Sequence, residues 1–313
     1  MENLVLAFNV VAPLLMLMLV GYFVRAVKLA DADTMLKMNR IVFKVFLPVM
    51  LFNNIISTDL STSVNWPLML TAMAFIVLEF FLGMIVIPLI EKEPARRGVL
   101  VQGIFRANFV IFGLPVITSL NGADSNLGMV SLVMACATPV FNIMAVLALE
   151  FHRGGKPDVK RMLIGIAKNP LIIASVVGIL FLVSGLKLPK VLAQTVNDIG
   201  KISTPLALFI LGAGFEFKSV KKCVKQLIIG VSGRLIIIPI IFLTFAILLG
   251  FRGEELAVLM VMLGAPPAVS SYTMAQQMDG DADLAASLVV FGSLLAVFTM
   301  FCWIFLLKTI GFI

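Results

Sequence analysis

The stretch RANFVIFGLPVITSLN, from Arg106 to Asn121, is apolar enough to lie in a lipid bilayer, yet it contains Asn108 and the sequence Gly113-Leu114-Pro115. A proline inside a helix removes one backbone donor and clashes with the carbonyl four residues earlier. In lipid, the backbone groups freed in this way must be satisfied by protein, water or ligand. We therefore expect a membrane helix that is broken at Pro115.

A second stretch, LGAPPAVSSYTMAQQ from Leu263 to Gln277, has the same design. Its apolar start is followed by Pro266 and Pro267 and then by small polar residues. Two hydrophobic segments interrupted by Gly or Pro, at matching positions of two halves of a chain, indicate the binding site of a transporter. The two stretches therefore predict a paired site.

The composition is that of an integral membrane protein. Of 313 residues, 61% are hydrophobic and 13% are charged, whereas soluble domains have about 25% charged residues. The net charge of +7 indicates basic cytoplasmic loops rather than a nucleic-acid partner. One histidine and three scattered cysteines give no metal-ligand spacing, and no catalytic set lies within the apolar segments. We expect no cofactor and no enzyme activity, and we expect the lipid bilayer of the cell membrane as the surroundings.

Ten apolar stretches are long enough to span a membrane, which takes about 20 residues. They cover residues 4–27, 36–58, 67–90, 97–120, 127–150, 163–184, 191–216, 226–250, 255–278 and 283–309. The sequence therefore predicts an all-α integral membrane protein with ten transmembrane helices. Lys and Arg gather in the loops after spans 1, 3, 5 and 7, which places those loops in the cytoplasm and both termini outside it. The loop after span 9 is acidic, but acidic residues count little in this rule.

An internal repeat relates the two halves. Three pairs of matching positions lie 157 residues apart (for example 170 − 13), namely Pro13-Leu14 with Pro170-Leu171, Gly21 with Gly178, and Lys44-x3-Pro48 with Lys201-x3-Pro205. The expected breaks, Pro115 and Pro266, are 151 residues apart (266 − 115). Residues 1–152 form the first five-helix repeat, 153–162 a cytoplasmic connecting loop and 163–313 the second repeat. Because five spans is an odd number, the second repeat enters the membrane inverted.

Two half-helix N-termini, one at Pro115 and one at Pro266–Pro267, are then expected to meet inside the membrane. Each offers free N–H groups and about half a positive charge, so that together they favour an anion such as a carboxylate. The alternative is that these prolines only kink structural helices.

Several polar residues accompany the breaks. Asn108 lies two helical turns before Pro115 and either contacts a substrate or bonds to another helix. Asn142, Ser270 and Ser271 either line a pathway or join helices. We expect Arg106 to extend toward the interface, with direct contact to an anion as the alternative. Glu79 and Arg234 are deeper charges, either members of ion pairs or coupling groups.

The order of these residues resembles that of the auxin efflux carrier family, which includes bacterial malate and malonate permease-like proteins. The resemblance covers the whole chain and rests on Asn108-x6-Pro115 with Gly113, Pro266 with Ala275, Asn169-Pro170, Leu211-Gly212 and Glu150. It implies ten spans in two inverted repeats, with helices 4 and 9 broken at their prolines and crossing. Spans 1, 2, 6 and 7 would form a scaffold, and spans 3–5 and 8–10 a transport unit. Asn108 matches the substrate-contacting asparagine, and Pro115 and Pro266 match the crossover prolines.

The predicted function is a secondary carrier for a small organic anion such as malate, malonate or another carboxylate, operating by alternating access. The plant auxin carriers of this family have an acidic residue and a lysine near the start of span 3. Residues 66–74 have neither, so auxin is not the expected substrate. The alternative is a sodium-coupled symporter of the bile-acid type, with Ser270, Ser271 and Gln276 as ion ligands. A homodimer is compatible with either function.

Overall fold

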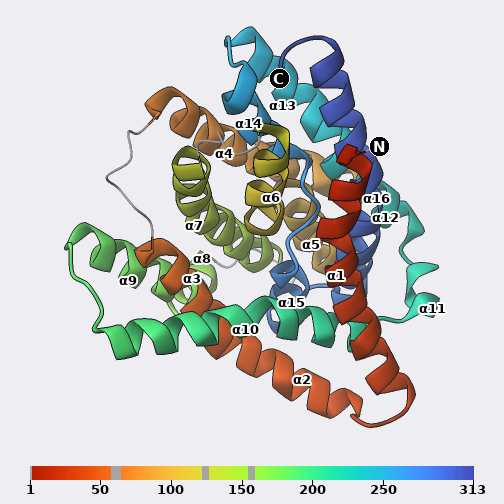
Figure 1. The fold of residues 1–313 in the computed structure, drawn as a ribbon. Helices are drawn as coiled ribbons and strands as arrows, with labels where there is room; N and C mark the ends of the chain where they lie inside the picture. Colours follow the sequence, from red (N-terminus) through yellow and green to blue (C-terminus); the bar gives the residue numbers. More distant parts are fainter. Residues whose placement is uncertain (1, 58–64, 122–126, 154–158) are drawn as a thin grey trace.

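The computed structural model describes residues 2–57, 65–121, 127–153 and 159–313, and within these ranges the chain is helical with no named strand (Figure 1). The predicted all-α class is confirmed. Residues 154–158 of the expected connecting loop lie outside the described residues.

Each of the ten predicted stretches is a helix or a run of consecutive helices. The first half contains α1 (Glu2–Ala26), α2 (Ala32–Ile41), the π-helix η1 (Val42–Phe46), α3 (Leu47–Ile56), α4 (Trp66–Ile90), α5 (Pro94–Phe105), α6 (Phe109–Asn121) and α7 (Leu127–His152). The second half contains α8 (Val159–Ala167), α9 (Pro170–Val183), α10 (Lys190–Gly214), α11 (Phe217–Val220), α12 (Val224–Ser232), the π-helix η3 (Gly233–Ile237), α13 (Ile238–Leu248), α14 (Gly253–Gly264), α15 (Ser270–Gln277) and α16 (Ala282–Thr309).

Four helical segments are long and apolar enough to cross a membrane by themselves: Trp66–Ile90, Met129–His152, Val224–Leu248 and Ala282–Thr309. Shorter apolar helices are Val11–Ala26, Phe109–Thr118 and Pro170–Val183. The chain is therefore a multi-pass membrane protein, in which some predicted spans are divided into shorter helices.

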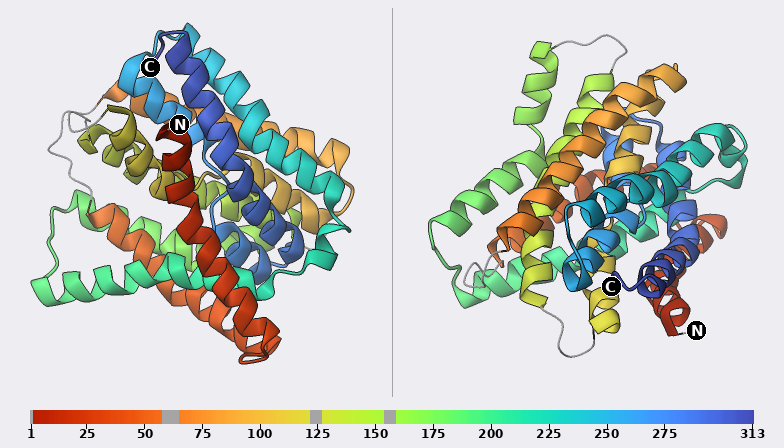
Figure 2. Two further views of the ribbon diagram at one scale, coloured as in Figure 1. Left: turned by 45° about the vertical axis from the view of Figure 1, so that its right-hand side comes forward. Right: turned by 90° about the horizontal axis from the view of Figure 1, so that it is seen from above.

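Two close helix contacts involve residues of the repeat. The helix α1 crosses α10 and packs against it, and α3 packs against α9 (Figures 1 and 2). Gly21 of α1 faces the backbone of Phe209, and Gly212 of α10 faces the backbone of Met18 so closely that a Cβ atom would collide with it. Gly178, the repeat partner of Gly21, lies against Ile55 of α3, where a Cβ atom would be 3.2 Å away. Small residues let membrane helices approach closely, which explains the glycines at these two contacts.

We expect Gly212→Ala to lower the free energy of unfolding by about 1–3 kcal/mol, the usual cost of overpacking, because the new methyl group meets a backbone carbonyl. Gly200→Ala in the same helix is the matched control. There the nearest atom to a new Cβ is 3.4 Å away, so the higher helix propensity of alanine should leave stability equal or slightly raised. Thermal unfolding in detergent measures both variants. Equal midpoints would show that the α1–α10 contact tolerates a side chain.

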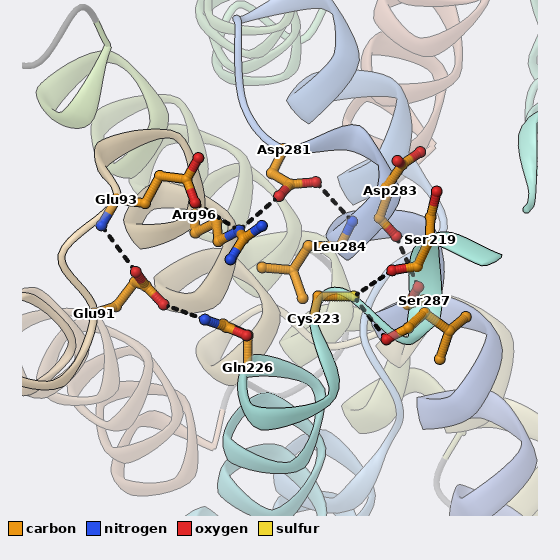
Figure 3. A network of polar contacts seen from close by, with 11 residues as sticks. Glu91, Glu93, Arg96, Ser219, Cys223, Gln226, Asp281, Asp283, Leu284 and Ser287 are labelled. Carbon is orange, nitrogen blue, oxygen red and sulfur yellow. Dashed lines mark hydrogen bonds and ion pairs between the residues drawn. The ribbon is translucent and has the colours of Figure 1, made fainter. Parts of the chain in front are cut away.

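Loops that follow spans 3, 7 and 9 meet at one end of the molecule (Figure 3). Arg96 Nε lies 2.9 Å from Asp281 Oδ2, and the backbone N–H of Asp281 donates to the Ala95 carbonyl at 3.0 Å. Glu91 Oε2 accepts a hydrogen bond from Gln226 at 2.6 Å. Partial burial acts to raise the pKa of Glu91, but hydrogen bonds from the Glu93 backbone and from Gln226 outweigh it and lower the pKa.

The loop after span 5 joins the same end. Arg153 Nε pairs with Asp279 at 2.8 Å, and Arg153 Nη1 pairs with Glu150 at 3.0 Å. The acidic residues after span 9 therefore pair with arginines of neighbouring loops, which explains how an acidic loop lies among basic ones. Both chain termini lie toward the opposite end of the bundle (Figure 2, left).

Candidate functional site

Two interrupted helices cross at the centre of the structure. The chain leaves helical geometry between α5 and α6, at Arg106–Asn108, and between α14 and α15, at Ala265–Val269. At the crossing, Ala107 and Pro267 form an antiparallel bridge. The backbone N–H of Asn108 donates to the Pro266 carbonyl at 2.8 Å, and the N–H of Ala268 donates to the Arg106 carbonyl at 3.2 Å. Each break thus satisfies part of the backbone freed in the other.

The two prolines suit this bridge. Pro267 lies opposite Ala107, and the hydrogen bonds of the bridge join their neighbours instead of these two residues. The missing N–H of the proline therefore costs nothing there. Pro266 contributes only its carbonyl. A proline also drives the preceding residue out of helical geometry, and Ala265 has φ −64° and ψ 147°. The second break therefore lies where the sequence predicts it.

The predicted position of the first break is wrong. Helix α6 begins at Phe109 and continues through Gly113 and Pro115. A proline in a helix removes one hydrogen bond and produces a kink without necessarily ending the helix, whereas Arg106–Asn108 gain two hydrogen bonds by leaving it. The bridged residues are 160 apart in sequence (267 − 107), closer to the 157 of the other repeat pairs than the 151 expected from Pro115.

A cavity of about 80 Å³ lies beside the crossing. A water molecule needs on the order of 10–15 Å³, so the cavity has room for several waters or a small ligand. The polar residues among its described lining are Asn54, Arg106, Asn108, Thr138, Asn142, Thr204 and Ser270. The apolar lining includes Leu47, Leu51, Phe141, Leu171 and Ala207.

Arg106 is the charged residue of this lining, and only 4% of it is exposed. Its Nη2 donates to Asn142 Oδ1 at 2.5 Å, and its Nη1 lies 3.0 Å from the sulfur of Met274 and 3.5 Å from Ser271 Oγ. Among the described residues, no carboxylate forms an ion pair with it. An uncompensated buried charge is costly, and within a membrane protein it marks a functional site.

The expectation that Arg106 extends to the membrane interface is therefore wrong. The residue ends α5, and its own carbonyl takes part in the bridge. Because the side chain starts at the crossing, its guanidinium reaches the cavity instead of the interface.

Asn108 lines the same cavity and is 8% exposed. Its side-chain Nδ2 has no hydrogen-bond partner among the described residues. A buried donor left without a partner costs about 1–3 kcal/mol, which a ligand oxygen would remove. The expected alternative is a hydrogen bond from Asn108 to another helix. Among the described residues, its Nδ2 forms no such bond.

The starts of two helices also reach the cavity. Its lining includes Phe109, Val110 and Ile111 from the first turn of α6, and Val269 and Ser270 at the start of α15. The first N–H groups of a helix have no partner within that helix and carry a partial positive charge. The predicted pair of half-helix N-termini is thus present, with the first one beginning at Phe109 rather than at Pro115.

The other predicted site residues divide into three groups. Asn142 and Ser270 line the cavity, and Asn142 Nδ2 is fixed by the Thr138 carbonyl at 2.8 Å. Ser271 lies behind Arg106, and its carbonyl accepts from Gln102 at 3.2 Å. The described lining does not include Pro266 and Pro267, which form the bridge, or Pro115 within α6. Gly113 also lies within α6.

The structure does not bring together the expected sodium ligands. Gln276 lies at the far end of α15, where its Oε1 accepts from Asn39 at 2.5 Å and its Nε2 donates to the Tyr272 hydroxyl at 3.0 Å. Six residues of helix separate it from Ser270 by about 9 Å. The hydrogen bond from Asn39 holds Gln276 against α2, and a sodium site shared with Ser270 and Ser271 stays a prediction.

Arg234 of η3 is fully buried and is not among the described residues that line the cavity. It donates to four backbone carbonyls at the ends of α5 and α14: Ala265 at 2.8 Å, Met262 at 2.5 Å, Phe105 at 3.1 Å and Ile104 at 3.2 Å. Glu79 Oε2 lies 3.5 Å from Arg234 Nη1. Of the two expected roles, membership of an ion pair is confirmed, and Arg234 also stabilises both helix C-termini.

Residues 6–304 match a known protein family, the membrane transport proteins. The chain belongs to this family. The resemblance to the auxin efflux carrier family is thereby confirmed. The uncharacterized transporter MJ1031 of Methanocaldococcus jannaschii is 25% identical over 304 residues, which cover 94% of this chain and 97% of that protein. The uncharacterized transporter YfdV of Escherichia coli strain K12 is 25% identical over 318 residues, which cover 96% and 97%. As a member of the membrane transport protein family, the chain is a membrane transporter.

Proposed function

We propose that this transporter is a secondary carrier for a small organic anion, with a carboxylate as the bound group. The observation that carries the proposal is the cavity at the crossing, where the buried Arg106 guanidinium has no carboxylate partner among the described residues. Asn108 Nδ2 and the first turns of α6 and α15 add further donors. Such a set stabilises an anion that leaves water. Malate and malonate, bound with a single negative charge, and related carboxylates are candidate substrates.

We further propose that ten spans form two inverted repeats. Helix contacts support this arrangement because they occur in matching pairs: α1 with α10 corresponds to α9 with α3, and α4 with α5 corresponds to α13 with α14. The scaffold would contain α1, α2–α3, α9 and α10, and the transport unit α4–α7 and α12–α16. Both termini would lie outside the cytoplasm.

The cavity supports alternating access. Its lining comes partly from α3, α9 and α10 of the proposed scaffold and partly from the crossing and α7 of the proposed transport unit. A substrate bound there would be exposed to one side or the other when the two units rock against each other. Ion pairs among the loops after spans 3, 5 and 9, together with the Glu91–Gln226 hydrogen bond, would let the transport unit move as a rigid body.

The test is thermal unfolding of the purified protein with a panel of carboxylates, in sodium and in potassium buffers. A ligand at a hundred times its dissociation constant stabilises the folded state by about 2.7 kcal/mol. We expect stabilisation by at least one carboxylate and none by choline. The same shift is expected in both buffers, because four carbonyls at the ends of α5 and α14 already accept hydrogen bonds from Arg234.

The outcomes are distinct. If no carboxylate raised the unfolding temperature, the proposed function would be refuted. Stabilisation that requires sodium would instead favour the symporter and contradict the ion independence expected here.

A further inference from the structure

We infer that the site selects carboxylates with a single negative charge and discriminates against dicarboxylate dianions of the same size. This inference rests on the proposed function and deepens it. It starts from a count of full charges at the cavity. Arg106 is the one charged side chain among the described residues of the lining.

The next buried cation near the crossing does not add a second charge to the cavity. Arg234 donates to four carbonyls at the ends of α5 and α14, none of them from the described lining of the cavity, and pairs with Glu79. Its charge is therefore balanced locally by the carboxylate and by the negative ends of α5 and α14. The charge that remains for a ligand is that of Arg106, supplemented by partial charges at the starts of α6 and α15.

These partial charges act on the same end of the ligand. Helix α6 begins three residues after Arg106, and Ala268, two residues before α15, donates to the Arg106 carbonyl at 3.2 Å. Asn108 Nδ2, two residues from Arg106, lies on the same lining. All of these donors therefore suit one carboxylate bound at Arg106.

The lining from α3, α9 and α10 offers nothing equivalent. It consists mainly of Leu47, Met50, Leu51, Leu171 and Ala207, with the neutral side chains of Asn54 and Thr204. A ligand anchored at Arg106 would meet these groups with its other end. An ionised second carboxylate would lose its hydration there without a countercharge, whereas an amide, hydroxyl or short alkyl end would be accepted.

The experiment compares malonate with malonamate, which has the same shape but an amide in place of one carboxylate. Binding of each to the full-length protein is measured by calorimetry and thermal unfolding at pH 8, where malonate is a dianion. We expect malonamate to bind at least tenfold more tightly. Lowering the pH to 5 increases the monoanion fraction of malonate, so its binding should improve while that of malonamate stays nearly constant.

A variant of the protein tests the number of positive charges at the cavity directly. Thr204→Lys adds a cation on the α10 side of the cavity and should narrow or reverse the preference for malonamate. Equal or tighter binding of malonate to the unmodified protein would overturn the inference while leaving the proposed function intact. If no carboxylate in the wider panel bound, the proposed function would fail together with the inference.

Discussion

Replacing Arg106 with glutamine should weaken carboxylate binding by at least about 30-fold, because loss of one partner of a buried, hydrogen-bonded charge pair costs about 2–5 kcal/mol. The residue supplies the only full positive charge in the described lining of the cavity. Its loss leaves the Asn108 amide and two helix starts, which are partial charges. Calorimetric titration of the variant with a carboxylate that stabilises the unmodified protein measures the effect.

Stability of the ligand-free protein should change in the opposite direction. In the absence of ligand, Arg106 is a buried charge without a carboxylate partner among the described residues, and replacement of such a group by a neutral one is often neutral or stabilising. We expect the unfolding temperature of Arg106→Gln without ligand to equal or exceed that of the unmodified protein. A variant that loses both binding and stability would indicate a structural role for Arg106 instead.

Two further variants refine this test. Arg106→Lys keeps the charge but loses the planar fork that holds Asn142 and a carboxylate together, so its affinity should be intermediate. Lys201→Gln removes an exposed charge from α10 and should leave binding unchanged. If Arg106→Gln bound the ligand as well as Lys201→Gln does, the anion site would have to lie elsewhere.

The helices could be predicted from the sequence because hydropathy alone identifies them. Each predicted stretch is long and apolar, and its described residues form one helix or consecutive helices separated by short interruptions. An apolar segment in lipid must satisfy its backbone hydrogen bonds internally, and a helix does so whatever its neighbours are. Hydropathy does not reveal the shorter interruptions within a span. One of them, at Lys168–Asn169 between α8 and α9, depends on a local hydrogen bond, in which Asn169 caps α9 by accepting from the Leu171 N–H.

The predicted first break is misplaced because the prediction attributes the break to a proline. The prolines of the second stretch do lie in its break, and the prediction therefore aligns Pro115 with Pro266. Keeping the offset of 157 found in the other spans would have put the first break near residue 109 (266 − 157). That position is next to Asn108 and six residues before Pro115. The break depends on hydrogen bonds between two distant segments, which no local residue pattern encodes.

The same dependence hid the roles of the buried arginines. The prediction that Arg106 reaches the interface assumes one continuous helix around it, whereas α5 ends at Phe105 and α6 begins at Phe109. Arg234 and Glu79 lie 155 residues apart, and the carbonyls that Arg234 binds exist as free acceptors only after both helices are broken. The sequence does contain one signal for the position of Arg106. The offset of 157 residues between the matching positions of spans 1, 2, 6 and 7 predicts a break next to Arg106 and so predicts this residue at the site.

Replacing Arg234 with methionine should be the most destabilising single change at the crossing. It removes the donors to four buried carbonyls at the ends of α5 and α14, and each buried acceptor left without a partner costs about 1–3 kcal/mol. We expect the free energy of unfolding to fall by at least about 4 kcal/mol, with a large decrease in the unfolding temperature measured in detergent. Arg252→Met, at an exposed arginine that also donates to backbone carbonyls, is the matched control and should lower stability by about 1 kcal/mol or less.

Glu79→Gln separates the two roles of Arg234. The Glu79–Arg234 contact is long, at 3.5 Å, and a glutamine oxygen can still accept from Arg234, so the loss should be about 1 kcal/mol. If Glu79→Gln destabilised the protein as much as Arg234→Met, the ion pair rather than the carbonyl contacts would hold the crossing. If it is nearly neutral, the bridge between Ala107 and Pro267 depends on Arg234 as a donor to both helix ends. Carboxylate binding should then weaken in Arg234→Met even in the fraction that stays folded, because Arg106 and Asn108 flank Ala107 in that bridge.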